Sequence, residues 1–150
     1  MSNTLSKKDI LLVFIDLPVD DAPKLVSPIQ IMKAMFLLKE ETKIQDFYEF
    51  IPYLYGPCSF EVYSDLISLK EENLIEDVQS PFSWKYYKVT AKGNEVTNRL
   101  LKSFDNTLLQ KLKEIKMFVL SKTFPELLRY VYEKYPAYAE KTVINLGALK

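Results

Sequence analysis

One helical pattern followed by two short strand patterns, between residues 58 and 89, constrains the fold of this chain more than any other feature. The helical pattern begins at Cys58 or Ser59 and ends near Asn73. The segments LIEDV (74–78) and WKYYKV (84–89) have the composition of strands, and QSPFS between them is typical of a hairpin connection. This order predicts a mainly α-helical protein with a small β-hairpin.

The first part of the chain carries two helix start signals. Ser6 can cap a helix that continues to about Leu17, and SPIQ (27–30) supplies the serine, proline and glutamine of a second helix start. The segment FYEFIPYLYGP (47–57) is expected to be extended and to turn at Gly56. The second helix is apolar nearly all round and is predicted to be buried, on the basis of Ile29, Ile31, Met32, Met35, Phe36 and Leu38.

Three further helical patterns follow the hairpin. Thr90 can cap a helix that continues to residue 104, and residues 105–122 form an amphipathic pattern. TFPE (123–126) has the composition of a capping box and begins a last helix that ends before Pro136. The predicted order is therefore three helices, a strand, a loop, a strand and then further helices.

This order is that of a winged helix-turn-helix protein with a helical C-terminal extension. We expect residues 1–100 to form the winged-helix domain and residues 101–150 to pack on it as part of one structural unit. A chain of 150 residues, 48% of them hydrophobic, can bury a core of its own without a disulfide or a structural metal.

The composition also bears on location and partners. Twenty basic and twenty acidic residues cancel, which excludes a strongly basic coat for nucleic acid. The single cysteine, Cys58, excludes an intramolecular disulfide and fits a reducing compartment. The uninterrupted apolar run at residues 10–15 is too short for a secretory signal or a membrane span. These features predict a cytoplasmic protein with no membrane partner.

Two groups of segments resemble known regulator families. DLISLKEENLIED (65–77) with YYKVTAKG (86–93) resembles the third helix, the wing and the YxLTxKG closure of PadR-type and MarR-type regulators, with Val89 in place of the usual leucine. SPIQIMKAMFLL (27–38) with FYEFIPYLYGPCSFEVYSDL (47–66) is similar to YwgA-like prokaryotic winged-helix proteins, and more distantly to the Panacea domain of SocA-like antitoxins. The resemblance implies a regulator-like winged helix, and Panacea-type relatives act through protein contacts.

The helix that occupies the DNA-reading position carries an unusual charge pattern. Its apolar residues are expected to pack on the core as one arc: Phe60, Val62, Tyr63, Leu66, Ile67 and Leu69. Its outward face is predicted to consist of Glu61, Ser64, Asp65, Ser68, Glu71 and Glu72. Four carboxylates on one face would be repelled by DNA phosphates. Three interpretations remain: a solvated face, a partner-binding face formed by Glu61, Ser64, Asp65, Ser68 and Glu72, and direct insertion into a DNA groove, which these charges disfavour.

Basic residues are concentrated after this helix. Nine basic and three acidic residues lie between positions 85 and 122. If duplex DNA binds, Lys85, Lys88 and Lys92 at the wing are expected to contact phosphates with little base reading, and otherwise they are solvated charges. The apolar stripes of the C-terminal helices, and the opposite charges of the two segments, also suggest a homodimer.

The chemistry of enzymes has little support in this sequence. The chain contains no histidine, one cysteine and three glycines, which excludes histidine-dependent catalytic triads, the usual zinc sites and a phosphate-binding glycine loop. No catalytic residue, metal site or cofactor is predicted. The sequence therefore favours a non-enzymatic, transcription-regulator-like protein, and the alternative is a protein-interaction adaptor or antitoxin-like module.

Overall fold

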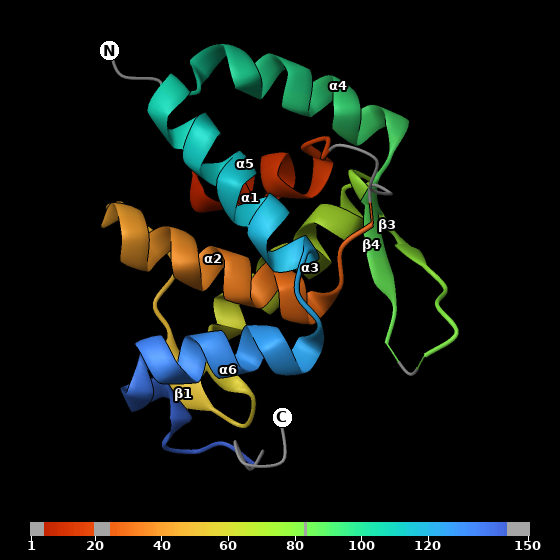
Figure 1. Ribbon diagram of the computed structural model, residues 1–150. Coiled ribbons are helices and arrows are strands. Elements are labelled where there is room, and N and C mark those ends of the chain that lie inside the picture. Colours follow the sequence, from red (N-terminus) through yellow and green to blue (C-terminus); the bar gives the residue numbers. More distant parts are fainter. Residues whose placement is uncertain (1–4, 20–24, 83, 144–150) are drawn as a thin grey trace.

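The computed structural model describes residues 5–19, 25–82 and 84–143, and within them the chain is mainly α-helical with two small antiparallel hairpins (Figure 1). In chain order the elements are α1 (Lys7–Asp16), α2 (Pro28–Thr42), β1 (Ile51–Tyr53), β2 (Gly56–Cys58), α3 (Phe60–Glu71), β3 (Ile75–Val78), β4 (Tyr86–Val89), α4 (Ala91–Leu100), η1 (Leu101–Ser103), α5 (Asn106–Leu120), α6 (Phe124–Lys134) and η2 (Pro136–Ala139).

Helices α1 and α2 supply the centre of the core. Residues 10–15 of α1 and 31–38 of α2 are all buried, so each helix is covered on every side over that length. This confirms the prediction that α2, which is apolar nearly all round, is buried. Both helices begin with complete capping boxes, in which the side chains of Ser6 and Ser27 accept a hydrogen bond from the third helical residue.

Polar contacts fix the end of α1 between α4 and α5. The buried side chain of Lys116 on α5 donates through Nζ to the carbonyl oxygens of Ile15, at 2.9 Å, and of Leu17, at 2.6 Å. The carboxylate of Asp16 accepts from Asn94 and Thr97 on α4. The free carbonyls at the end of α1 are thereby paired inside the protein, where an unpaired carbonyl would be costly.

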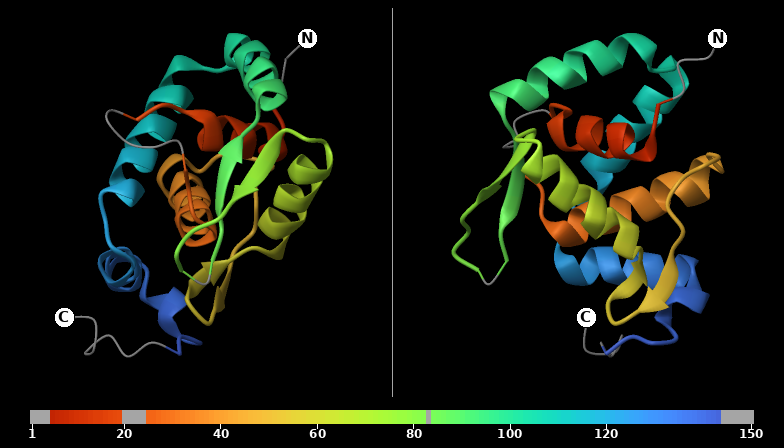
Figure 2. Two further views of the ribbon diagram at one scale, coloured as in Figure 1. Left: turned by 90° about the vertical axis from the view of Figure 1, so that its right-hand side faces the viewer. Right: turned by 180° about the vertical axis from the view of Figure 1, so that it is seen from behind.

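The β3–β4 hairpin forms where the sequence predicts it. Ile75 pairs with Val89 and Val78 with Tyr86, and the hairpin extends beyond the helices as an arm (Figure 2). Val26, just before α2, and Tyr87 on β4 form an antiparallel β-bridge in which each backbone N–H donates to the carbonyl oxygen of the other residue. The arm is therefore joined to the core through β4 and the start of α2.

Residues 51–58 form a second hairpin, which differs from the sequence expectation. The extended segment reverses at Leu54 and Tyr55, and β1 pairs with β2 in the register Ile51 to Cys58. Gly56 follows the reversal with a φ of 92°, a backbone conformation in which a side chain would be strained. The expected turn at Gly56 is thus displaced toward the N-terminus, and Gly56 begins the second strand.

The C-terminal helices bury their apolar stripes against the rest of the chain. Helix α5 packs on α1 and α2, and α6 packs on β2. The buried residues of these helices belong to the same core cluster as α1 and α2: Leu112, Ile115, Val119, Leu127, Leu128, Val131 and Tyr132. Much of these stripes is thus buried within the chain, and a homodimer through the C-terminal helices stays a prediction. The boundary at residue 100 stays a prediction.

In the part of the chain that the structure describes, each helix is too short or too polar to cross a bilayer.

Candidate functional site

Helix α3 is held on the core by one narrow stripe. Its buried residues are Val62, Leu66 and Leu69, and the backbone N–H of Ser59, just before the helix, lies 3.3 Å from Sδ of Met32 on α2. At about 100° per residue, the three buried positions fall within about 60° of one another. The stripe is thus much narrower than the predicted apolar arc.

The other three apolar residues of α3 are exposed, so the prediction that they pack on the core is wrong. Phe60, Tyr63 and Ile67 are 54%, 42% and 59% exposed. They form a second stripe at the spacing i, i+3 and i+7, roughly 100–120° away from the buried stripe. Tyr53 of β1 adds a fourth exposed side chain, whose ring makes an edge-to-face contact with Phe60 at 5.3 Å between centroids. We call these four residues the exposed α3 face.

Two of the four acids of α3 form ion pairs with lysines of α1, which is a second correction to the sequence analysis. Nζ of Lys7 lies 2.6 Å from a carboxylate oxygen of Glu61, and Nζ of Lys8 lies 2.6 Å from one of Glu72. Ser68 also donates to Glu72 and accepts from Lys8. These hydrogen bonds lower the pKa of Glu72. Two of the four acids, Glu61 and Glu72, are therefore compensated by lysines of the same chain.

Asp65 faces a buried tyrosine. The hydroxyl of Tyr48, whose side chain is fully buried, donates to Asp65 at 2.7 Å. Burial, followed by the hydrogen bond to Asp65, raises the pKa of Tyr48 far above its ordinary value, so the hydroxyl stays a donor. Of the predicted partner-binding residues, Glu61, Asp65, Ser68 and Glu72 thus contact their own chain. Ser64 is exposed beside the exposed α3 face.

The predicted phosphate contacts on the wing are balanced by acids of β3. Nζ of Lys85 lies 3.4 Å from Asp77, which also binds Nζ of Lys70 at 2.6 Å. Nζ of Lys88 lies 3.9 Å from Glu76, its cross-strand partner. The pKa of Asp77 is lowered chiefly by the hydrogen bond from Lys70. Both wing lysines remain about half exposed, but their charges are partly compensated.

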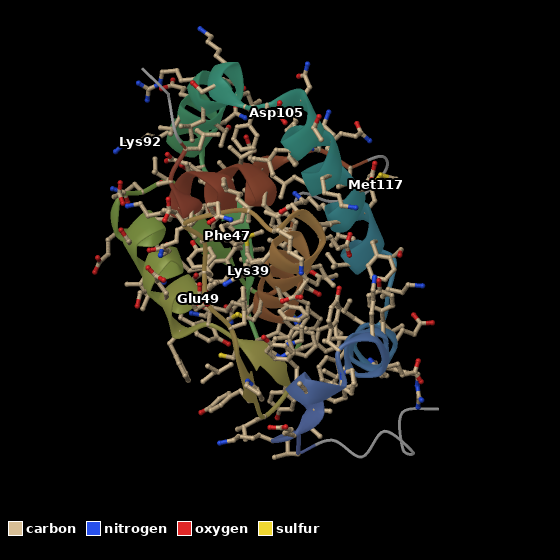
Figure 3. The ribbon with its side chains drawn as sticks, turned by 90° about the vertical axis from the view of Figure 1, so that its left-hand side faces the viewer. Lys39, Phe47, Glu49, Lys92, Asp105 and Met117 are labelled. Atoms are coloured by element: carbon tan, nitrogen blue, oxygen red, sulfur yellow. The ribbon has the colours of Figure 1, made fainter. Side chains whose placement is uncertain are left out.

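Lys92 has a structural contact rather than a place on the wing. It lies in the first turn of α4, and its Nζ donates to the carbonyl oxygen of Glu72 at the end of α3, at 3.1 Å (Figure 3). A lysine at a helix C-terminus pairs a free carbonyl and interacts favourably with the helix dipole. The structure thus brings Lys85 and Lys88 together on β4 and places Lys92 at the end of α3.

Sequence reasoning missed two aromatic residues at the tip of the β3–β4 hairpin. Phe82 and Trp84 are both exposed, and their rings stack with centroids 4.7 Å apart and an interplanar angle of 12°. Ser80 holds this tip, since its hydroxyl lies 2.6 Å from the carbonyl oxygen of Trp84. The two aromatic residues in and beside the loop at 79–83 were the available signal for such a contact, because a plain hairpin connection does not require them.

A buried lysine and the single cysteine lie close together under the β1–β2 hairpin. Lys33 of α2 is 2% exposed, and burial lowers its pKa to about 8, partly opposed by the nearby thiol of Cys58. Burial is also the main cause of the raised pKa of Cys58. No local pattern of the sequence indicates a basic group near Cys58, because Lys33 lies 25 residues earlier. A raised thiol pKa disfavours the reactive thiolate.

Among the described residues, histidine, cysteine, aspartate and glutamate side chains do not gather in a group of three that could hold a metal ion. Comparison with models of known protein families finds no match to the chain. A search of curated proteins finds no similar sequence. The resemblance to YwgA-like, Panacea, PadR-type and MarR-type proteins therefore stays a prediction.

Proposed function

We propose that the chain is a non-enzymatic regulatory protein of winged-helix type whose α3 binds a protein surface rather than a DNA groove. The order of elements supports the winged-helix assignment, because α3 leads into the β3–β4 hairpin and Val26 adds a short bridge to β4. The proposed function is to bind another protein, and the surface that makes this contact is the exposed α3 face.

The exposure of Phe60, Tyr63 and Ile67 carries this proposal. A helix that reads DNA needs basic and hydrogen-bonding side chains toward the phosphates and base edges. This helix instead presents an apolar stripe, and its one lysine, Lys70, pairs with Asp77. Contiguous apolar surface rimmed by polar groups is typical of protein–protein contacts, and aromatic residues are enriched in them.

We assign a second copy of the chain as the occupant of the exposed α3 face. Lys70 lies at the C-terminal end of α3 and Glu61 at its N-terminal end. If two α3 helices pair antiparallel about a two-fold axis, their apolar stripes meet, and the Lys70 end of each helix lies near the Glu61 end of the other. Lys70 and Glu61 already pair with Asp77 and Lys7 within their own chain, and the ion pairs to Lys7 and Lys8 reduce the negative charge that would separate two copies.

Sedimentation or light scattering tests this proposal by comparing Ile67→Lys with the unchanged protein. We expect the protein to form dimers in the micromolar range and Ile67→Lys to weaken association at least about tenfold, because a charge would enter an apolar contact. Met117→Lys is the matched control, since Met117 is 53% exposed but lies on α5, away from α3 (Figure 3). A protein that stays monomeric at about 0.5 mM, or a control that dissociates equally, would exclude this surface.

Duplex DNA bound by the wing is the second candidate, and the exposure of Lys85 and Lys88 favours it. Contacts to phosphates would be strongest at low salt. DNA binding measured at about 50 mM salt, with a Lys85→Ala and Lys88→Ala double variant as comparison, distinguishes the two candidates. Absence of binding by the unchanged protein under these conditions would remove the DNA candidate.

A further inference from the structure

A cavity of about 580 Å³ opens where the wing meets the helices. It lies between the start of α2, the turn of the β1–β2 hairpin, the outer end of the wing and the start of α6. Its lining includes Gln30, Tyr55, Trp84, Tyr86, Lys122 and Phe124. Its volume lies in the range of about 300–1,000 Å³ that is typical of small-molecule sites.

Aromatic rings from separate elements form the walls of this cavity. Trp84 and Tyr86 come from the wing, and Tyr55 and Phe124 come from the hairpin turn and α6. Tyr55 and Phe124 contact each other edge to face at 6.1 Å between centroids, and Trp84 is held by its stack on Phe82. Such walls favour a flat, unsaturated ligand that can stack on the rings.

The polar groups of the cavity favour a negative charge. In the described part of the chain Lys122 has no ion pair, and its Nζ lies 5.3 Å from the centroid of Phe118. The side-chain oxygen of Gln30 accepts from the backbone of Ser27, which leaves the amide N–H groups available as donors. Among the described lining residues there is no aspartate or glutamate. The cavity thus offers one cation and neutral donors. The carboxylate of Glu126 lies outside the lining; hydrogen bonds at Thr123, and to a smaller extent the charge of Lys122, lower its pKa.

We propose that this cavity binds a planar aromatic anion, such as an aromatic carboxylate. The ring system stacks against the aromatic walls, and the carboxylate pairs with Lys122 and accepts from Gln30. Because Trp84 and Tyr86 belong to the wing, a bound ligand holds the wing against α2 and α6. This site is independent of the proposed dimer, since Phe60, Tyr63 and Ile67 do not line it.

The single tryptophan of the chain gives a direct test of this site. Its one indole N–H resonance, recorded by NMR on ¹⁵N-labelled protein, belongs to Trp84 in the cavity wall. The probes are 2-naphthoate and 2-naphthylmethanol, which share a ring system but differ in charge. We expect 2-naphthoate to shift this resonance in a saturable way and to bind at least about tenfold more tightly than the alcohol, because an ion pair forms only with the carboxylate.

Lys122→Gln should weaken the binding of 2-naphthoate about tenfold and leave the binding of the alcohol within about twofold. Lys113→Gln is the matched control, because Lys113 is an exposed lysine of α5 that does not line the cavity. It should bind both probes as the unchanged protein does. Three results would overturn the proposal: equal affinity for the two probes, equal losses in the two lysine variants, or no movement of the indole resonance at about 1 mM probe.

Discussion

Replacing Gly93 with alanine is expected to lower the free energy of unfolding by about 3 kcal/mol, as overpacking of a tight contact does. A Cβ atom at this position would lie 2.1 Å from the carbonyl oxygen of Leu74 and 2.6 Å from Cγ1 of Val89. The carbonyl of Leu74 also accepts from the backbone N–H of Thr90 at 3.0 Å, so it cannot move without loss. The start of α4 and the start of β3 are therefore pressed together at Gly93.

Denaturant unfolding of Gly93→Ala measures this effect, with Glu95→Ala, an exposed change on the same helix, as the control. The sign of the result is informative. Helix propensity alone would make the alanine variant more stable, by about 1 kcal/mol. The close contact with Leu74 and Val89 predicts the opposite. A Gly93→Ala protein that is at least as stable as Glu95→Ala would show that α4 does not approach β3 so closely.

Gly93 illustrates which parts of the fold the sequence could predict. The helix starts were predictable because a capping box is local, and Ser6, Ser27 and Thr123 all form one. The β3–β4 pairing was also predictable, since both strands and their connection are adjacent in the chain. The packing role of Gly93 depends on Leu74, which lies far outside its own turn, and no local pattern encodes it.

The candidate site was harder to predict for the same reason. The sequence shows which residues of α3 are charged, but not which residues pair with them. Lys7 and Lys8, which pair with Glu61 and Glu72, lie more than fifty residues earlier in the chain. The exposed stripe of Phe60, Tyr63 and Ile67 follows from how much of α3 the core covers. Periodicity separates the two apolar stripes of a helix but does not tell which of them meets the core. That choice is made by tertiary packing.

Replacing Lys33 with methionine is expected to raise the free energy of unfolding at pH 7 by about 2 kcal/mol, because an unpaired buried charge is removed while the unbranched side chain is kept. Among the described residues no salt bridge or side-chain hydrogen bond involves Nζ of Lys33, which keeps a slight contact with solvent although the residue is only 2% exposed. Its pKa falls from 10.5 to about 8. At roughly 1.4 kcal/mol for each pH unit, this fall corresponds to about 3 kcal/mol of destabilisation by the charged form.

The pH dependence distinguishes this cause from a change in packing. Between pH 8 and 10.5 the unfolded chain keeps a proton on Lys33 that the folded protein has lost, so this lysine makes stability rise with pH across that range. The advantage of Lys33→Met should therefore be largest below pH 8 and should narrow toward pH 10.5. Thermal or denaturant unfolding at several pH values measures the difference between the variant and the unchanged protein.

Lys39→Met is the matched control for Lys33→Met on the same helix. Lys39 pairs with Glu49 at 2.8 Å and donates to the carbonyl oxygen of Tyr48 at 2.8 Å, so its replacement should lower stability at pH 7 (Figure 3). The expected result is that Lys33→Met raises the free energy of unfolding at pH 7 and Lys39→Met lowers it. A Lys33→Met protein that is less stable than the unchanged protein at pH 7, or whose advantage is constant up to pH 10.5, would show that Lys33 is not held as an unpaired charge in the core.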